Sequence, residues 1–130
     1  MSPYAEWFKC FGDRWCDLLE INLEHSLFDG TKGIYIIWFG ERKPTVLKVG
    51  KGVIRERLSE HREDYILASY SQYGLYTTWA EVADKDCDGV AKYLEETLKP
   101  LMGTRMHEVP SIKVNLPWEG SFIHEKKEIA

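Results

Sequence analysis

The chain lacks the sequence features that mark several well-defined classes of protein. In its 130 residues no apolar run approaches the ~20 residues that cross a membrane, and the N-terminus shows no basic region followed by an apolar core. The motifs Gly-x-Ser-x-Gly and His-Glu-x-x-His are absent, as are a nucleotide-hydrolase phosphate loop, internal repeats and low-complexity segments. We therefore expect one domain, a cytoplasmic location and no association with membranes.

Cysteine is scarce, and its pattern argues against cross-links. The three cysteines, Cys10, Cys16 and Cys87, are odd in number and include no Cys-x-x-Cys pair. The sequence predicts reduced cysteines packed in the interior, rather than a disulfide or a zinc-binding set.

The acidic balance of the chain disfavours a general nucleic-acid binder, although the basic residues are unevenly spread. The formal net charge is −4 and the pI is about 5.6, whereas nucleic-acid binders are usually basic. Positions 42 to 62 contain seven basic residues and two acidic ones, which gives a local charge of +5 (7 − 2). Such a strip is able to hold a phosphate backbone on an otherwise acidic protein.

Two apolar runs joined by a polar turn predict a β-hairpin. The runs cover 34–39 and 45–49, and the turn between them contains Pro44. The first run is apolar on both faces, as in a central strand, so Tyr35 is expected to be half-buried with a partner for its hydroxyl. Gly50-Lys51-Gly52 then breaks the chain before a helix begins.

Further periodic segments complete a small α/β domain. Aromatic and β-branched residues predict a third strand, and apolar stripes of helical period predict two helices. The expected fold is a three-stranded antiparallel sheet flanked by helices, with an acidic turn before the last helix and a short edge strand after it. The strands are 33–39, 45–49 and 75–82, the helices 53–69 and 90–101, the turn 84–89 and the edge strand 111–116.

The remaining segments extend this domain at both ends. Residues 1–29 carry tryptophan, phenylalanine and leucine at a spacing that suits one or two short amphipathic helices. This N-terminal helical extension either covers one face of the sheet or binds a partner protein or a second copy of the chain. We expect the domain itself to span 30–118 and a charged, frayed tail to span 119–130.

A glycine break that feeds a basic helix predicts a phosphate site. Free backbone N–H groups and the helix dipole both favour an anion at such a junction. Arg57 and His61 lie four residues apart and are therefore neighbours on the helix surface. The alternative interpretation is a solvated helix face, in which the arginines pair with nearby glutamates and His61 is a structural residue.

These residues resemble the motifs of the GIY-YIG nuclease family. The family has a Gly-Ile-Tyr strand, a Tyr-Ile-Gly strand, a helix with an arginine–leucine pair and a histidine, and a later helix with a metal-binding glutamate. All four elements occur here in the family's order between residues 31 and 116. They are Gly33-Ile34-Tyr35, Lys48-Val49-Gly50, Arg57-Leu58 with His61, and Leu94-Glu95 with Leu98 and Pro100.

The resemblance implies a DNA endonuclease that uses one divalent metal ion, magnesium or manganese. In this assignment Glu95 binds the metal, Arg57 binds the phosphate, and Tyr35 orients or deprotonates the attacking water. His61 belongs to the same catalytic set. Three further basic residues are expected to contact the DNA backbone, namely Lys51, Arg55 and Arg62.

Three positions need a closer interpretation. Lys48 stands where most of the family has a tyrosine, and a protonated lysine stabilises charge instead of accepting a proton as a phenol does. Asn115, twenty residues after Glu95, is the candidate for a late asparagine that the family often has in its site. Helical period alone does not decide between Glu95 and Glu96, and the family's residue order favours Glu95.

Two other functions are compatible with the same residues. One is a non-catalytic module on the same scaffold that binds nucleic acid or protein. The other is a metal-free enzyme that uses the glycine break to hold a phosphorylated small molecule. With so short a basic strip, we also expect any DNA-binding form to act as a homodimer or with a partner protein.

Overall fold

The computed structural model describes residues 4–40, 43–103, 108–118 and 128–129. The strands in these ranges are β1 (Lys9–Cys10), β2 (Cys16–Asp17), β3 (Lys32–Phe39), β4 (Thr45–Val53), β5 (Leu75–Glu81) and β6 (Glu128–Ile129). The helices are α1 (Ile54–Arg62), α2 (Tyr65–Ala68) and α3 (Asp84–Leu98), and two short 3-10 helices are η1 (Ser26–Phe28) and η2 (Ser71–Tyr73). None of the helices in the described part is long and apolar enough to cross a membrane.

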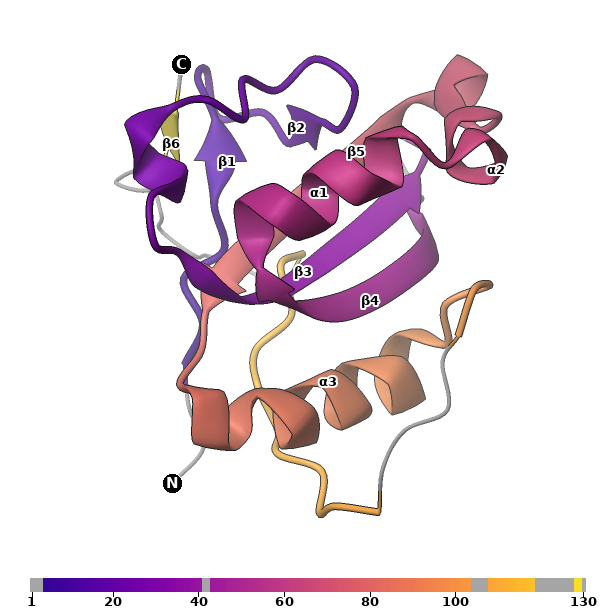
Figure 1. Cartoon of the computed structure of the whole chain (residues 1–130). Coiled ribbons are helices and arrows are strands. Elements are labelled where there is room, and N and C mark those ends of the chain that lie inside the picture. The colour runs from indigo at the N-terminus through magenta and orange to yellow at the C-terminus, as the bar shows by residue number, and fades with distance from the viewer. Residues whose placement is uncertain (1–3, 41–42, 104–107, 119–127, 130) are drawn as a thin grey trace.

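An antiparallel sheet with the strand order β2-β5-β3-β4 forms the centre of the molecule. The prediction of a small α/β domain with an antiparallel sheet is confirmed, and β3 is a central strand as its two apolar faces indicated. The predicted number of three strands is wrong, because β2 from the N-terminal segment adds a fourth beside β5. Helix α1 covers one face of the sheet and α3 covers the other (Figure 1).

Alternation along β3 divides the core into two layers. Tyr35 and Ile37 point to the α1 side, whereas Ile34 and Ile36 point to the α3 side, and all four side chains have no exposed surface. Successive residues of a strand face opposite sides of a sheet. The odd-numbered positions of this strand therefore belong to the α1 face, on which the predicted site residues Tyr35, Arg57 and His61 all lie.

The predicted helix at 53–69 is shorter than expected. Helix α1 ends at Arg62, and Asp64 begins α2 as its N-cap by accepting hydrogen bonds from the backbone N–H groups of Ile66 and Leu67. An aspartate at this position satisfies N–H groups that a continuous helix would bond internally. The chain therefore turns after Arg62, which the apolar stripe did not indicate.

Two predicted breaks are part of regular elements. Gly50–Gly52 lies within β4, where Gly52 pairs with Gly33 of β3, so the helix follows the strand directly. The predicted acidic turn at 84–89 forms the first turns of α3 instead. Asp84 and Asp86 are favourable there, because carboxylates stabilise the positive end of a helix dipole.

The described part of the N-terminal segment forms no α-helix, contrary to the prediction, and contains one short 3-10 helix, η1. Trp7 belongs to the core layer on the α3 side and Phe8 to the layer on the α1 side, where its ring stacks on Trp79 at 5.2 Å. Neighbouring residues that point to opposite faces indicate an extended chain. Because these two rings are buried, they fit the interpretation in which the segment covers the sheet, and they do not form an exposed contact surface for a partner or second copy.

Two of the three cysteines form a disulfide, so the prediction that all are reduced is wrong for this pair. Cys10 and Cys16 have Cα atoms 5.0 Å apart across a tight turn, in which Cys10 also bridges to Arg14. The turn brings together two residues whose spacing shows no recognisable pairing motif. Cys87 is a free and buried thiol, as predicted.

The C-terminal segment packs without forming the predicted edge strand at 111–116. Ile112 donates its backbone N–H to Gly89 of α3, and Val114 is buried against the same helix layer. Residues 128–129 pair in parallel with β1 and are not frayed. The rest of the predicted tail, 119–127 and 130, lies outside the described residues.

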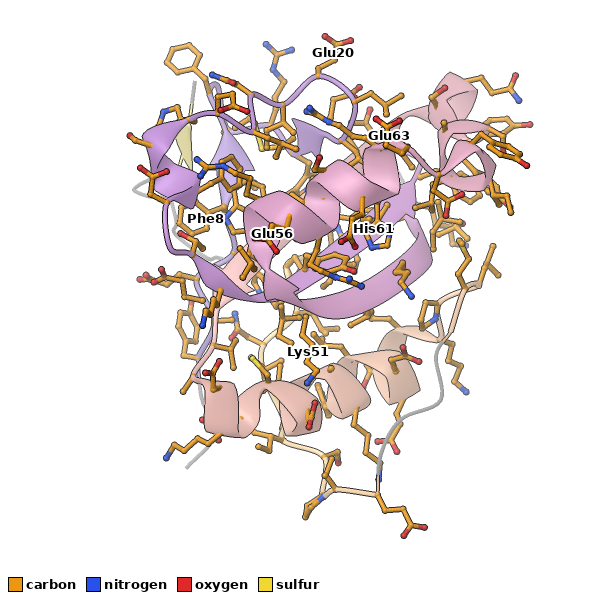
Figure 2. The ribbon with its side chains drawn as sticks, in the orientation of Figure 1. Phe8, Glu20, Lys51, Glu56, His61 and Glu63 are labelled. Carbon is orange, nitrogen blue, oxygen red and sulfur yellow. A yellow bond between two sulfur atoms is a disulfide. The ribbon has the colours of Figure 1, made fainter. Side chains whose placement is uncertain are left out.

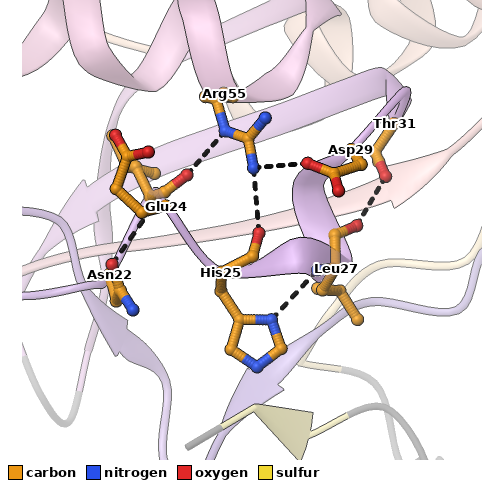
Figure 3. A network of polar contacts seen from close by, with 8 residues as sticks. Asn22, Glu24, His25, Leu27, Asp29, Thr31 and Arg55 are labelled. Atoms are coloured by element: carbon orange, nitrogen blue, oxygen red, sulfur yellow. Dashed lines mark hydrogen bonds and ion pairs between the residues drawn. The ribbon is translucent and has the colours of Figure 1, made fainter.

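Two arginines of α1 tie the N-terminal segment to the helix, and Figure 3 shows the contacts of the first of them, Arg55. Arg55 donates from Nε to the Leu23 carbonyl at 2.6 Å, and from Nη2 to the His25 carbonyl at 2.9 Å and to Asp29 at 2.8 Å. At the C-terminal end of the same helix, Arg62 donates from Nε to the Leu18 carbonyl at 2.8 Å and from Nη2 to the Ile21 carbonyl. Charged donors thus satisfy four carbonyl groups of a segment that has almost no regular structure.

We predict that Arg62→Met destabilises the fold by about 1.5–3 kcal/mol, the usual range for hydrogen bonds that involve a charged group. Methionine keeps an apolar stem but leaves the carbonyls of Leu18 and Ile21 without this donor. Urea denaturation measures the effect, with the exposed neighbour Glu63 as the control site, where Glu63→Gln should change stability by about 0.5 kcal/mol or less. Equal stability of Arg62→Met and the wild type would show that these bonds do not hold the segment.

Candidate functional site

A buried hydrogen bond between Tyr35 and His61 lies at the centre of the candidate site. The Tyr35 hydroxyl is 2.6 Å from His61 Nε2, and the phenol has no exposed surface, so it is more buried than predicted. Figure 2 shows His61 beneath α1, between the helix and the sheet. The strand register puts Gly50 opposite Tyr35, where a Cβ atom would lie 2.2 Å from the phenol oxygen. Glycine at this position therefore makes the room that the phenol occupies.

The electrostatic environment sets the protonation of this pair. Burial raises the pKa of the Tyr35 phenol, and the Arg57 guanidinium opposes that rise. Burial also lowers the pKa of His61, and the positive charges of Arg57 and Lys48 lower it further. At neutral pH the tyrosine is consequently a phenol and the histidine a neutral ring. A neutral ring accepts the phenolic O–H at Nε2 when its other nitrogen carries the proton.

Arg57 extends across the strand end toward the phenol. Its stem passes Gly52, where a Cβ atom would lie 3.1 Å from Arg57 Cγ. Nη1 forms an ion pair of 2.8 Å with Glu60, one turn further along the same helix. Nε is buried and has no hydrogen-bond partner. The solvated-face interpretation therefore accounts for one nitrogen of this guanidinium, while the guanidinium also interacts with the Tyr35 phenol through its charge and through a hydrogen bond, which oppose the rise that burial causes in the pKa of the phenol.

Lys48 lies on the same face of the sheet as Tyr35. It lies opposite Ile37 in the pairing of β3 with β4, two residues along each strand from the pair of Tyr35 and Gly50. Its ammonium group is near enough to His61 to lower the pKa of the ring. Within the described residues Lys48 forms no ion pair. Arg57 and His61 therefore lie beside the phenol, and Lys48 lies near His61.

Glu95 comes from α3, which packs on the face of the sheet opposite to Tyr35 and α1. The ion pair between Lys51 and Asp88 at 2.5 Å fixes the start of α3 beside the end of β4. Seven residues along a helix advance ~10 Å, and three residues along a strand advance ~10 Å. Glu95 is therefore level with Lys48, and the chain after α3 confirms this direction by bonding Leu101 N–H to the Val46 carbonyl.

Helix geometry also separates the two candidate glutamates. Viewed along the axis of α3, the side chain of Glu95 is rotated by about 20° from that of Asp88, whereas the side chain of Glu96 is rotated by about 80°. Glu96 is exposed, while Glu95 is partly buried with its Oε1 3.5 Å from the Cβ position of Gly103. Glu95 is therefore the carboxylate that α3 directs along the β4 side.

The described residues include no group of three or more His, Cys, Asp or Glu side chains that would hold a metal ion. A metal at this edge would therefore have Glu95 as its protein carboxylate and otherwise water and substrate oxygens as ligands. Magnesium is commonly held in this way, through one or two carboxylates, several waters and phosphate oxygens.

Four residues predicted in the site have other partners. Lys51 pairs with Asp88 on α3, and Arg55 and Arg62 bind carbonyl groups of the N-terminal segment. The charged groups of these three residues, which were predicted to contact DNA, are therefore engaged within the chain. Asn115 binds the backbone of Ala5 through both groups of its amide, at 2.7 and 2.9 Å. Ala5 belongs to the α3-side layer, so Asn115 lies across the sheet from Tyr35.

A cavity of about 810 Å³ lies elsewhere and contains none of the predicted site residues. Its described lining comes from the turn that the disulfide closes and from the far end of the sheet, including Trp15, Trp38 and Tyr76. The candidate site at α1 and β4 therefore lies apart from this cavity.

Of the residues that restrain the site, Glu60 was anticipated by the solvated-face interpretation, whereas the roles of Asp88 and Gly50 were not. Glu60 holds Arg57, Asp88 holds Lys51, and Gly50 accommodates the phenol. The spacing of Arg57 and Glu60, three apart on a helix, was a usable signal for the first pair. No sequence signal links Lys51 to Asp88, because the contact depends on how α3 packs under β4.

Comparison of the chain with protein-family models, with curated proteins and with solved structures found no match.

We predict that His61 makes stability depend on pH in a defined direction. Because the pKa of His61 is lowered in the folded state, the unfolded chain binds the proton first as pH falls below about 6.5. The contribution of His61 to stability is therefore present above that pH and declines as pH falls toward the lowered folded value. In His61→Gln this part of the decline should disappear.

Urea unfolding at pH 7.5, 6.5 and 5.5 measures the difference between the two proteins. His25→Gln is the matched control, because it removes a histidine outside the pair and should keep the wild-type trend. A stability gap between the wild type and His61→Gln that is the same at all three pH values would contradict the prediction.

Proposed function

We propose that this chain is a divalent-metal-dependent DNA endonuclease that hydrolyses phosphodiester bonds. The observation that supports this most strongly is the buried Tyr35–His61 pair beside the Arg57 guanidinium. A guanidinium that the described residues hold by a single ion pair is well suited to bind a negatively charged ligand. The resemblance of the motifs to GIY-YIG nucleases points to a phosphate group as that ligand.

The Tyr35–His61 pair supplies a route for the proton of the attacking water. The phenol oxygen takes a proton from water while its own proton passes to His61 Nε2 over 2.6 Å. Because both transfers occur together, no free phenolate forms, which matters since burial raises the pKa of Tyr35. The lowered pKa of His61 keeps the ring neutral and ready to accept the proton.

Access to the phenol depends on Arg57. Tyr35 has no exposed surface, so water reaches its oxygen only when a covering side chain moves. Arg57 is 38% exposed and is held by a single ion pair to Glu60. Binding of a phosphate by the guanidinium would draw it from Glu60 and open the phenol to water. The substrate would in this way complete the site before reaction.

Charge stabilisation comes from two side chains and a metal ion. Arg57 is suited to two parallel hydrogen bonds with phosphate oxygens, and Lys48 adds a positive charge beside them. A magnesium or manganese ion held by Glu95 would stabilise charge on the phosphoryl and leaving oxygens. The division of labour leaves proton transfer to Tyr35 and His61.

A non-catalytic binding module is the competing function, and Glu95 separates the two. We expect Glu95→Gln to reduce magnesium-dependent nicking of plasmid DNA by about 100-fold or more, since the metal would lose its carboxylate. Glu96→Gln, one residue away and exposed, is the matched control and should keep wild-type activity. A wild type that nicks no duplex, branched or single-stranded DNA with magnesium or manganese would favour the binding module.

Lys48 provides a second test, at the position where the family pattern differs. Lys48→Ala should lower the single-turnover cleavage rate about a hundredfold or more while leaving the fold intact, because a charge that stabilises the reaction is lost. Lys48→Tyr should retain part of the activity. Lys32→Ala, which removes an exposed lysine from the start of β3, serves as the control. Full activity of Lys48→Ala would remove this residue from the mechanism.

A further inference from the structure

Three aromatic rings form a cluster at the far end of the face that carries the candidate site. Phe39, the last residue of β3, stacks on Tyr70 with ring centres 4.8 Å apart and an angle of 23°. Tyr73 packs on the other side of Phe39 at 5.7 Å and 44°. We call Phe39, Tyr70 and Tyr73 the aromatic cluster.

The exposure of the cluster increases outward. Phe39 and Tyr70 are partly buried and pack against the α1-side core, which fixes their positions. Tyr73 is 56% exposed, although its ring packs on that of Phe39. An aromatic side chain that the core holds in place while one ring remains open to solvent offers a rigid surface to a flat ligand.

The cluster lies in line with the candidate site. Tyr35, Ile37 and Phe39 follow one another on the same face of β3, and Lys48 lies opposite Ile37 between the two ends. Four residues of strand span ~13 Å. Stacked nucleotides of one strand are spaced by ~3.4 Å, so the distance from the cluster to the Tyr35–His61 pair corresponds to about four nucleotides. An extended strand would cover the same distance with fewer nucleotides.

An exposed lysine, Lys43, lies in the turn next to the cluster. Gly40 donates its backbone N–H to the carbonyl of Gly74, which brings the turn after β3 beside Tyr73. Lys43 in that turn is exposed, and its carbonyl oxygen lies 3.1 Å from the Cβ position of Gly40. With Lys48 between the cluster and the pair, a negatively charged backbone would meet a lysine at both positions.

We propose that the aromatic cluster binds an unpaired base of the DNA strand whose phosphate enters the candidate site. This inference rests on the proposed function and specifies its substrate as DNA with single-stranded character next to the cleaved bond. Every base has a flat face that stacks on tyrosine, so the contact is tolerant of sequence. Backbone phosphates would follow Lys43 and Lys48 while the base stacks on Tyr73.

Binding measured without cleavage tests this proposal separately from the nuclease activity. Fluorescence anisotropy in EDTA compares a labelled twelve-nucleotide thymidine strand with an abasic strand that has the same phosphates and no bases. We expect the wild type to bind the thymidine strand more tightly. Tyr73→Ala should weaken that binding by ~5- to 100-fold and remove the preference, since one base–aromatic stack is lost.

Two controls distinguish stacking from loss of structure or charge. Phe11→Ala removes an aromatic residue that is 71% exposed and belongs to the N-terminal turn, not to the cluster, and it should bind as the wild type does. Tyr73→Phe keeps a ring and should retain the preference for bases. The slope of binding against salt concentration should be the same in Tyr73→Ala and the wild type, because Tyr73 neutralises no phosphate.

The outcomes are distinct for the two proposals. Equal binding of the thymidine and abasic strands by the wild type, or an unchanged preference in Tyr73→Ala, overturns the stacking proposal even if the protein cleaves DNA. A base preference that depends on Tyr73 supports it even if no cleavage is found, and the proposed nuclease function would then fail alone. A changed salt slope in Tyr73→Ala also overturns it, since the residue would then act through charge.

Discussion

The close approach of the Tyr35 phenol to the backbone of Gly50 is the constraint on which the site depends. With any Cβ at position 50 the ring could not lie flat over β4, and its hydroxyl would not reach His61. The same approach places the phenol under α1, where burial keeps the tyrosine protonated and the histidine neutral. One missing side-chain atom in a strand thus positions a hydrogen bond and sets the charge of two groups.

Sequence patterns predicted the elements that repeat regularly and missed those that depend on single contacts. The three longer strands and the faces of β3 followed from apolar runs, because alternation reports directly on burial. The prediction for the N-terminal segment was wrong because its pattern also fits another structure. Its aromatic spacing fits a helix, yet Trp7 and Phe8 fill opposite layers of an extended chain. Spacing alone does not report which layer receives each ring.

The candidate site was predictable in its residue types but not in their partners. Motif order identified Tyr35, Arg57 and His61, and the structure brings these three together. The basic residues Arg55 and Arg62 looked equally suited to phosphate, since a sequence shows charge and helix position only. Their guanidinium groups instead satisfy carbonyls of a segment more than thirty positions away in the chain. Which arginines remain available to a ligand is decided by long-range packing.

The segment that follows α3 has a consequence for the solubility of the protein. β4 is the outer strand on its side of the sheet, and Leu101 and Met102 bond to its carbonyls at Val46 and Leu47. The opposite outer strand, β2, has only two residues. Unpaired outer strands invite pairing between molecules, and covering or shortening them prevents it. Substitutions that loosen the end of α3 would therefore expose a template for aggregation, besides moving Glu95.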